Sequence, residues 1–391
     1  MKIKSLLLGS AAASMLAVSG AQAADPIIYA EPEPMEYVRI CDVYGAGYYY
    51  IPGTETCLRI SGFARYQMGA VQEHAAGTPL WVQYHGAFVP GAWNKLARGR
   101  INFDARSETE WGTLRGFVRL ETDAGQSVNA SGATAMPWMF ISLGTQQGEL
   151  LAGYLESAWV WGGPIGNYGM HSDSGGAYGF QRRSQIRYTF TAAEGFFGLL
   201  SLEDNTGVHP NPTIVDARGR YLPDVVGKLG ISQAWGGVYG AFGYDAVDES
   251  WAARAGAQLN VPNAPGSSLI GTFYWANSAF NRYTPSIGGI VGSGAQWSGA
   301  ISYQHQFNPE FAAGIGYQYI NHFNGAVAAG VTIDRAETHL ADFTVIWTPV
   351  TDLEIRAEVG YAQAHGTNRA TGLSASTPGT WSGFLRFQRN F

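Results

Sequence analysis

The feature that most constrains the fold of this chain is an alternation with a period of two residues. In residues 58–68, every even position holds an apolar or small side chain, and the odd positions hold arginine, serine or glutamine, with Phe63 as the exception. This period is typical of β-strands whose two faces meet different surroundings. We count about 16 such segments, each about 8 to 11 residues long. They are clearest at 58–68, 98–106, 114–121, 184–190, 251–261, 269–275, 297–303, 311–319, 343–347 and 353–361.

The connectors between these segments are alternately short and long. Short connectors lie at 109–112, 146–148, 191–195, 235–237, 308–310 and 348–352. Long connectors lie at 69–97, 122–135, 157–181, 204–226, 277–294, 321–336 and 362–380. Tight turns at one end of the strands and long loops at the other are typical of outer-membrane barrels. The pattern predicts an all-β fold, a transmembrane antiparallel β-barrel of about 16 strands.

The composition excludes several other classes of protein. Charged residues make up 14% of the chain, whereas soluble domains carry about 25%. Outside the first 23 residues, however, no apolar run reaches the roughly 18 residues that a membrane helix needs. With 24 Lys and Arg against 30 Asp and Glu, a nucleic-acid partner is not expected. A soluble β-sandwich is the remaining alternative, but its solvent face would be rich in lysine, and only Lys95 and Lys228 follow residue 23.

The first residues have the pattern of a secretory signal peptide. Lys2 and Lys4 precede an apolar run over residues 6–18, and the small residues Ala21 and Ala23 come directly before a cleavage site after Ala23. We therefore predict three parts: a signal peptide (1–23), an N-terminal lead (24–57) and a transmembrane β-barrel (58–391). The protein is then exported through a cleaved signal peptide, and the outer membrane is its expected location.

The chain has two cysteines, Cys41 and Cys57, both in the lead. In an oxidising envelope, a pair this close in sequence is most simply a disulfide. Two free thiols or a metal site are the alternatives. A zinc site needs three or four ligands, and no histidine lies beside either cysteine.

Aromatic residues near the ends of the predicted strands suggest a girdle at the lipid interface. We place Trp138, Trp251, Trp297, Trp347 and Trp381 in this girdle. The chain ends at Phe391 in an amphipathic segment, which is similar to the sorting signal of outer-membrane barrels.

At three places the sequence resembles the general porin family of alphaproteobacteria. They are the acidic, proline-rich stretch 30–34, the block 37–59 that contains both cysteines, and the ending 381–387. The resemblance implies a 16-stranded homotrimeric barrel, embedded in outer-membrane lipid and lipopolysaccharide, through which small hydrophilic solutes and ions diffuse passively. It also implies that the third long loop, 157–181, folds into the lumen and forms a constriction opposite a ladder of arginines.

Charged residues on the polar face would determine which solutes pass. Arginine is the most frequent charged residue on this face, and Arg59, Arg106 and Arg115 lie on it in addition to the arginines named below. Arg98, Arg100, Arg182 and Arg183 match the family's ladder best, and few carboxylates oppose them, which predicts a weak preference for anions. The predicted constriction comprises Arg65, Arg98, Arg100, Arg119, Arg182, Arg183, Arg187, Glu156 and Asp173.

Motifs of enzymes are missing from the sequence: it has no Gly-x-Ser-x-Gly elbow, no His-Glu-x-x-His and no phosphate-binding loop. We expect no enzymatic activity, cofactor or metal. A channel specific for a sugar or an anion is the alternative to an unspecific pore. A sugar channel would show a track of aromatic residues along the lumen, whereas here Phe63 and Phe117 are the exceptions on a polar face.

Overall fold

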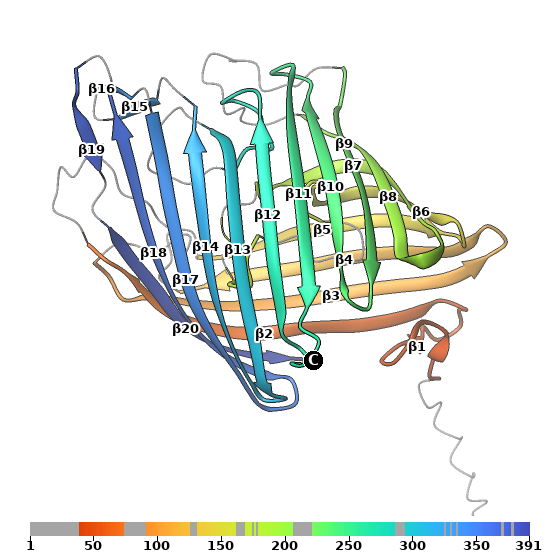
Figure 1. Ribbon diagram of the computed structural model, residues 1–391. Helices are drawn as coiled ribbons and strands as arrows, with labels where there is room; N and C mark the ends of the chain where they lie inside the picture. The colour runs from red at the N-terminus through yellow and green to blue at the C-terminus, as the bar shows by residue number, and fades with distance from the viewer. Residues whose placement is uncertain are drawn as a thin grey trace, which may run out of the picture. The chain divides into compact units, whose positions relative to one another are not determined.

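The computed structural model describes residues 39–73, 91–125, 131–161, 169–173, 176, 179–205, 221–285, 294–323, 326–328, 331–333, 335–368, 371–376 and 379–391. The predicted signal peptide, 1–23, lies outside the described residues. Residues 40–391 form one compact unit. Its main sheet has 18 strands in the described part, and two of these, β1 and β19, are short additions to a wall of sixteen (Figure 1). The predicted antiparallel β-barrel is confirmed.

The wall strands pair antiparallel in chain order. They are β2 (Cys57–Val71), β3 (Asn94–Thr109), β4 (Gly112–Ala124), β5 (Ser131–Gly144), β6 (Gly148–Glu156), β7 (Arg182–Thr191), β8 (Phe196–Glu203), β9 (Asp224–Gln233), β10 (Gly236–Asp245), β11 (Ser250–Asn260), β12 (Ser268–Ala276), β13 (Ala295–Asn308), β14 (Phe311–His322), β17 (Arg335–Val350), β18 (Leu353–Thr367) and β20 (Thr380–Asn390). The shorter elements are η2 (Asp42–Tyr44), β1 (Tyr49–Tyr50), η3 (Ala193–Gly195), β15 (Ala326–Ala328), β16 (Val331–Ile333) and β19 (Ser374–Ser376).

The barrel closes where the last strand, β20, meets the first wall strand, β2. Their register runs from Phe63 opposite Asn390 to Val71 opposite Ser382. At one end of this seam, the Gly62 amide donates to the Phe391 carbonyl oxygen (2.8 Å), and the Phe391 amide donates back to Gly62 (3.1 Å). Closure leaves neither of these two strands with an unpaired edge along the register.

The connectors have the predicted asymmetry, with differences at individual positions. Tight turns join β3 to β4, β5 to β6, β9 to β10, β13 to β14 and β17 to β18 at one end of the barrel. At the other end, β10 and β11 are joined by residues 246–249, which the sequence pattern did not predict as a connector. There Asp245 Oδ1 accepts from the amides of Val247 (3.0 Å) and Asp248 (3.1 Å), so a single aspartate closes a tight turn.

Over most of the wall, the two faces are those that the period-two pattern predicted. Trp251, Trp297, Trp347 and Trp381 lie on the outer face, each more than a third exposed. The prediction for Trp138 was wrong, because its ring lies inside the barrel, 5.5 Å from the ring of Trp161. Both faces of β5 are apolar around this position, so alternation could not assign a side. Among the described residues, no helix has the length and apolar character to span a membrane.

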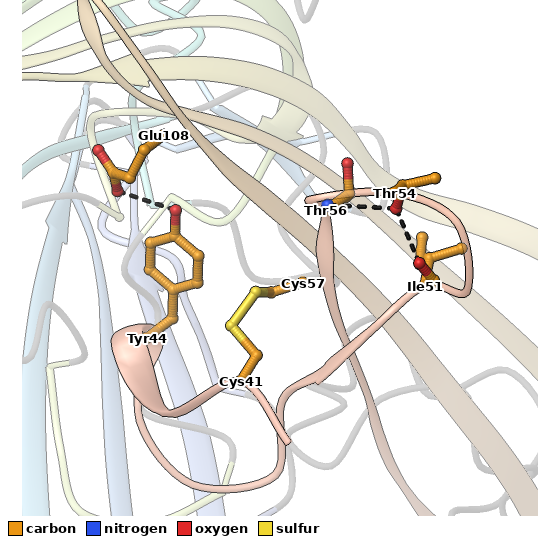
Figure 2. The surroundings of a disulfide bond; sticks show 7 residues. All are labelled: Cys41, Tyr44, Ile51, Thr54, Thr56, Cys57 and Glu108. Carbon is orange, nitrogen blue, oxygen red and sulfur yellow. Dashed lines mark hydrogen bonds between the residues drawn. A yellow bond between two sulfur atoms is a disulfide. The ribbon is translucent and has the colours of Figure 1, made fainter. Parts of the chain in front are cut away.

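The predicted disulfide between Cys41 and Cys57 is present, with Cα atoms 6.0 Å apart. It closes a segment, 41–57, that packs on the tight-turn end of β3 (Figure 2). Tyr44 donates to Glu108 Oε1 (2.8 Å), and Tyr48 donates to Asp104 Oδ2 (2.8 Å). Burial and the neighbouring Glu108 carboxylate raise the pKa of Tyr44 to about 12, so this tyrosine remains a hydrogen-bond donor at neutral pH.

Candidate functional site

The connector between β6 and β7, residues 157–181, crosses the inside of the barrel; we call it the crossing loop. Its root is fixed by Glu203 of β8, which is fully buried. Glu203 accepts from the Ser157 hydroxyl (2.7 Å) and from the Ala158 amide (2.8 Å). The next residue, Trp159, packs its ring against Tyr274 of β12, with centroids 6.0 Å apart. The root therefore belongs to a buried apolar cluster that includes side chains from β8 to β12.

The tip of the crossing loop reaches the far wall. His171 lies between two serine hydroxyls, Ser302 Oγ on β13 (2.9 Å from Nδ1) and Ser268 Oγ on β12 (2.8 Å from Nε2). Ser172 donates to Asp342 Oδ2 on β17 (2.8 Å). Because the loop leaves the wall at β6 and touches it again at β12, β13 and β17, it lies across the lumen. The expectation of a loop folded into the barrel is confirmed.

Asp173 continues this contact to the last strands. Its carboxylate forms a bidentate ion pair with Arg386 of β20, with Oδ2 2.6 Å from Nη2. Its amide donates to Glu358 Oε2 of β18 (2.8 Å). The Arg386 guanidinium holds the pKa of Asp173 well below its usual range. The carboxylate that was predicted to oppose the ladder is thus bound to an arginine outside the predicted set.

Four of the predicted arginines, Arg65, Arg98, Arg100 and Arg119, lie on β2 to β4. In the register of these strands Arg65 lies opposite Arg98, and Arg98 lies opposite Asp123. Arg98 binds both carboxylate oxygens of Asp123 (2.6 and 2.7 Å), and Arg100 binds Glu121 (2.6 Å). These two arginines are therefore partly neutralised by acids on the neighbouring strand.

Arg65 and Arg119 differ from their neighbours in this respect. Neither lies within ion-pair distance of a carboxylate among the described residues. The Nε of Arg65 donates to Gln388 Oε1 (2.8 Å), and the Nε of Arg119 donates to Asn102 Oδ1 (2.8 Å). An amide oxygen holds a guanidinium in place without cancelling its charge.

The three predicted arginines of β7 have separate surroundings. Arg182 lies opposite Glu156 in the register and interacts electrostatically with it. Arg183 donates from Nε to Gln181 Oε1 (3.0 Å). Arg187 is 5% exposed and interacts with Glu149 and Glu203, so it is more buried than the predicted arginines of β2 to β4.

The guanidinium groups near the loop form a continuous row of interacting charges. Arg386 interacts with Arg65, Arg65 with Arg98 and Arg100, Arg100 with Arg119, and Arg119 with Arg182. Within the described residues, four carboxylates interact with these six cations, Glu121, Asp123, Glu156 and Asp173, and a fifth, Glu358, accepts a hydrogen bond from the amide of Asp173. This row therefore has an excess of positive charge.

Sequence reasoning missed Arg386, Glu121 and Asp123 as members of this row. Arg386 does lie on the polar face of the last amphipathic segment, so the alternation contained the signal. Nothing in the sequence indicated that the tip of the loop would reach that strand. The described residues contain no group of three His, Cys, Asp or Glu side chains that could hold a metal ion.

Comparisons with known proteins agree with this architecture. Residues 25–384 match the model of the Porin subfamily. Over an alignment of 406 positions covering the whole of both chains, the sequence is 36% identical to porin Omp2b of Brucella abortus and to porin Omp2b of Brucella suis.

Solved structures show the same fold at low sequence identity. The outer membrane channel DcaP of Acinetobacter baumannii superposes with a TM-score of 0.62 at 14% identity, covering 88% of this chain and 99% of that one. An anion-selective porin from Comamonas acidovorans gives 0.56 at 11% identity, covering 86% and 100%. With a closed barrel, a loop across its lumen and full-length similarity to Omp2b porins, this chain belongs to the Porin subfamily: it is a Gram-negative outer-membrane diffusion channel for small solutes.

Proposed function

We propose that the narrow part of the channel lies between the crossing loop and the arginines of β2 to β4, and that it prefers anions. One observation carries this proposal: Arg65 and Arg119 have no carboxylate within ion-pair distance among the described residues. The whole loop, 157–181, contains one acidic residue, Asp173, and Arg386 binds its carboxylate. Fixed positive charge at a narrow point favours passing anions over cations.

The proposed constriction comprises the predicted set Arg65, Arg98, Arg100, Arg119, Arg182, Arg183, Arg187, Glu156 and Asp173, with Arg386 added. Rigid guanidinium groups suit this role, because they stay charged and their planar forks are easily held by neighbours. The formal charge of the chain is −6, but the charge of the whole chain does not determine the local field at a narrow point.

An unspecific channel is favoured over a sugar channel by the burial of the aromatic residues in the lumen. Phe63 and Phe117 are each 7% exposed, and Phe140 is 8% exposed. Arginine side chains lie over all three rings and over the partly buried ring of Trp138, which reduces the aromatic surface on which a passing sugar could stack. Passage is then governed by size and charge.

Two further parts of the proposal come from the family. A solved structure of OmpT from Vibrio cholerae, described as a trimer form, superposes with a TM-score of 0.51, and we propose a homotrimer for this chain too. We also propose that transport is its only activity, without catalysis or a cofactor.

The test is the reversal potential of the purified protein in a planar bilayer under a gradient of KCl. We expect stepwise open currents and a reversal potential whose sign shows that anions pass more readily than cations. The double variant Arg98→Ala and Arg100→Ala should change both conductance and selectivity. If this variant leaves both unchanged, the constriction has been assigned to the wrong residues.

A further inference from the structure

Of the four predicted constriction arginines on β2 to β4, Arg65 and Arg119 have no carboxylate within ion-pair distance among the described residues, and each lies over an aromatic ring. The Cζ of Arg119 is 3.9 Å from the ring centroid of Trp138. The Cζ of Arg65 is 4.6 Å from the centroid of Phe63, and Arg100 approaches the same ring at 4.6 Å. A cation over the face of a ring is attracted by the negative potential of the π system.

The strand register brings these groups together. Trp138 lies directly opposite Arg119, and Phe63 lies directly opposite Arg100. Arg65 is two residues from Phe63 on the same strand, so both side chains point to the same face. Phe63, the exception in the alternation of residues 58–68, therefore lies on the lumen face, where its ring meets both Arg65 and Arg100.

The ring of Trp138 has two aromatic neighbours. Phe117 of β4 lies at 5.9 Å, and Phe117 stacks on Phe140 at 5.1 Å. Trp161, at the root of the crossing loop, lies at 5.5 Å. The ring under Arg119 is thus fixed by both the wall and the loop.

A ring and a carboxylate hold a guanidinium with different electrostatic consequences. Asp123 and Glu121 hold Arg98 and Arg100 by ion pairs, and each carboxylate cancels positive charge where a solute passes. An aromatic ring attracts the cation through its quadrupole but carries no net charge. An arginine on a ring stays in place and keeps its full charge.

We propose that Phe63 and Trp138 are positioning residues for ion selection, which hold Arg65 and Arg119 at the channel surface as unneutralised cations. This inference rests on the proposed anion preference and assigns part of it to two uncharged side chains. Aromatic rings then act in the filter without touching the solute.

The test compares reversal potentials of charge-neutral variants in planar bilayers under a KCl gradient. Trp138→Leu removes the ring and changes no formal charge. We expect it to lower the anion-over-cation permeability ratio by at least about half as much as Arg119→Gln does. Trp138→Phe keeps a ring and should restore most of the ratio. Phe63→Leu should act in the same way as Arg65→Gln.

Phe384 provides a matched control. Its ring lies 4.6 Å from Cζ of Arg386, but that arginine is already paired with Asp173. Phe384→Leu should therefore leave the permeability ratio unchanged. An equal shift in this variant would overturn the inference, because loss of any lumen ring would then have the same effect.

The outcomes separate the two proposals. If Arg119→Gln shifts the ratio and Trp138→Leu does not, the role of the rings is wrong and the anion preference stands. If Arg65→Gln and Arg119→Gln both leave the ratio unchanged, the proposed function fails. Heat-dependent mobility on gels shows whether each variant has folded. If Trp138→Leu does not fold, Phe63→Leu decides the question.

Discussion

Asp173 and Arg386 connect the crossing loop to the last strand of the barrel through two parallel N–H···O bonds. Arg386 is almost fully buried, and its guanidinium also donates to Gln67 Oε1 of β2 (2.6 Å). The loop tip is therefore tied to the seam at which β20 and β2 close the barrel.

Removing the acid of this pair should loosen the loop. Asp173→Asn leaves a buried guanidinium without its anionic partner, at a cost of about 1.5–3 kcal/mol. We expect a lower unfolding midpoint in urea and more frequent closures in single-channel records. Asp123→Asn is a control, because Asp123 pairs with Arg98 on the wall and does not touch the described part of the loop. Equal closure frequencies in the two variants would contradict the anchoring role of Asp173.

Acid should weaken the docking of the same loop through His171. Burial between Ser302 and Ser268 lowers the pKa of His171 to about 4, against an ordinary value of about 6.5. In the docked loop His171 is neutral, whereas in a released loop its imidazole would be protonated below about pH 6.5. Docking is thus at full strength above that pH and weakens as the pH falls towards 4. Closure frequency should rise over this window, and His171→Gln should remove the dependence.

The disulfide should stabilise the N-terminal segment more than the barrel. Cys41 and Cys57 are 16 positions apart in the sequence, and closing a loop of this size contributes about 3 kcal/mol in the chain-entropy model. The barrel seam between β2 and β20 does not depend on the bond. After reduction, proteolysis should cut within 41–57 while the barrel keeps its folded mobility on gels. Unfolding of the whole barrel on reduction would refute this division.

Much of the fold could be predicted because residues that face the lumen and residues that face the lipid alternate along each strand of a barrel wall. β2, β3 and β4 separate apolar and charged positions clearly, and their faces were assigned correctly. β17 shows where the signal fails. The strand begins at Arg335, before the segment 343–347 that was predicted. In its first half the pattern is inverted, because Ala336 and Leu340 are buried inside and Glu337 faces outward.

The candidate site was less accessible to sequence reasoning, since it depends on contacts between distant parts of the chain. The alternation placed Arg65 and Arg119 in the lumen. It did not predict that their guanidinium groups would lie over the rings of Phe63 and Trp138. Which arginine receives Asp173 depends on the path of the loop across the barrel. A residue 213 positions away provides the partner, and neither periodicity nor spacing encodes such a pairing.

The closing seam offers a last prediction, at Gly62 of β2. A Cβ at this position would lie 2.0 Å from the carbonyl oxygen of Arg100 and 3.1 Å from the ring of Phe391. Backbone cannot yield as a flexible side chain can, so Gly62→Ala must displace either β3 or the end of the chain. Both backbone hydrogen bonds between Gly62 and Phe391 would be strained.

We expect Gly62→Ala to destabilise the closed barrel by about 1–3 kcal/mol, the usual cost of overpacking, and to reduce the yield of folded protein. Gly116→Ala on β4 is a matched control, since a Cβ there meets no atom within 4 Å. The urea midpoint and the fraction with folded mobility on gels measure both variants. Because closure alone removes the free edges of β2 and β20, the Gly62 variant should also aggregate during refolding while the Gly116 variant does not. Equal refolding of the two would show that β2 and β3 can separate enough to admit a methyl group.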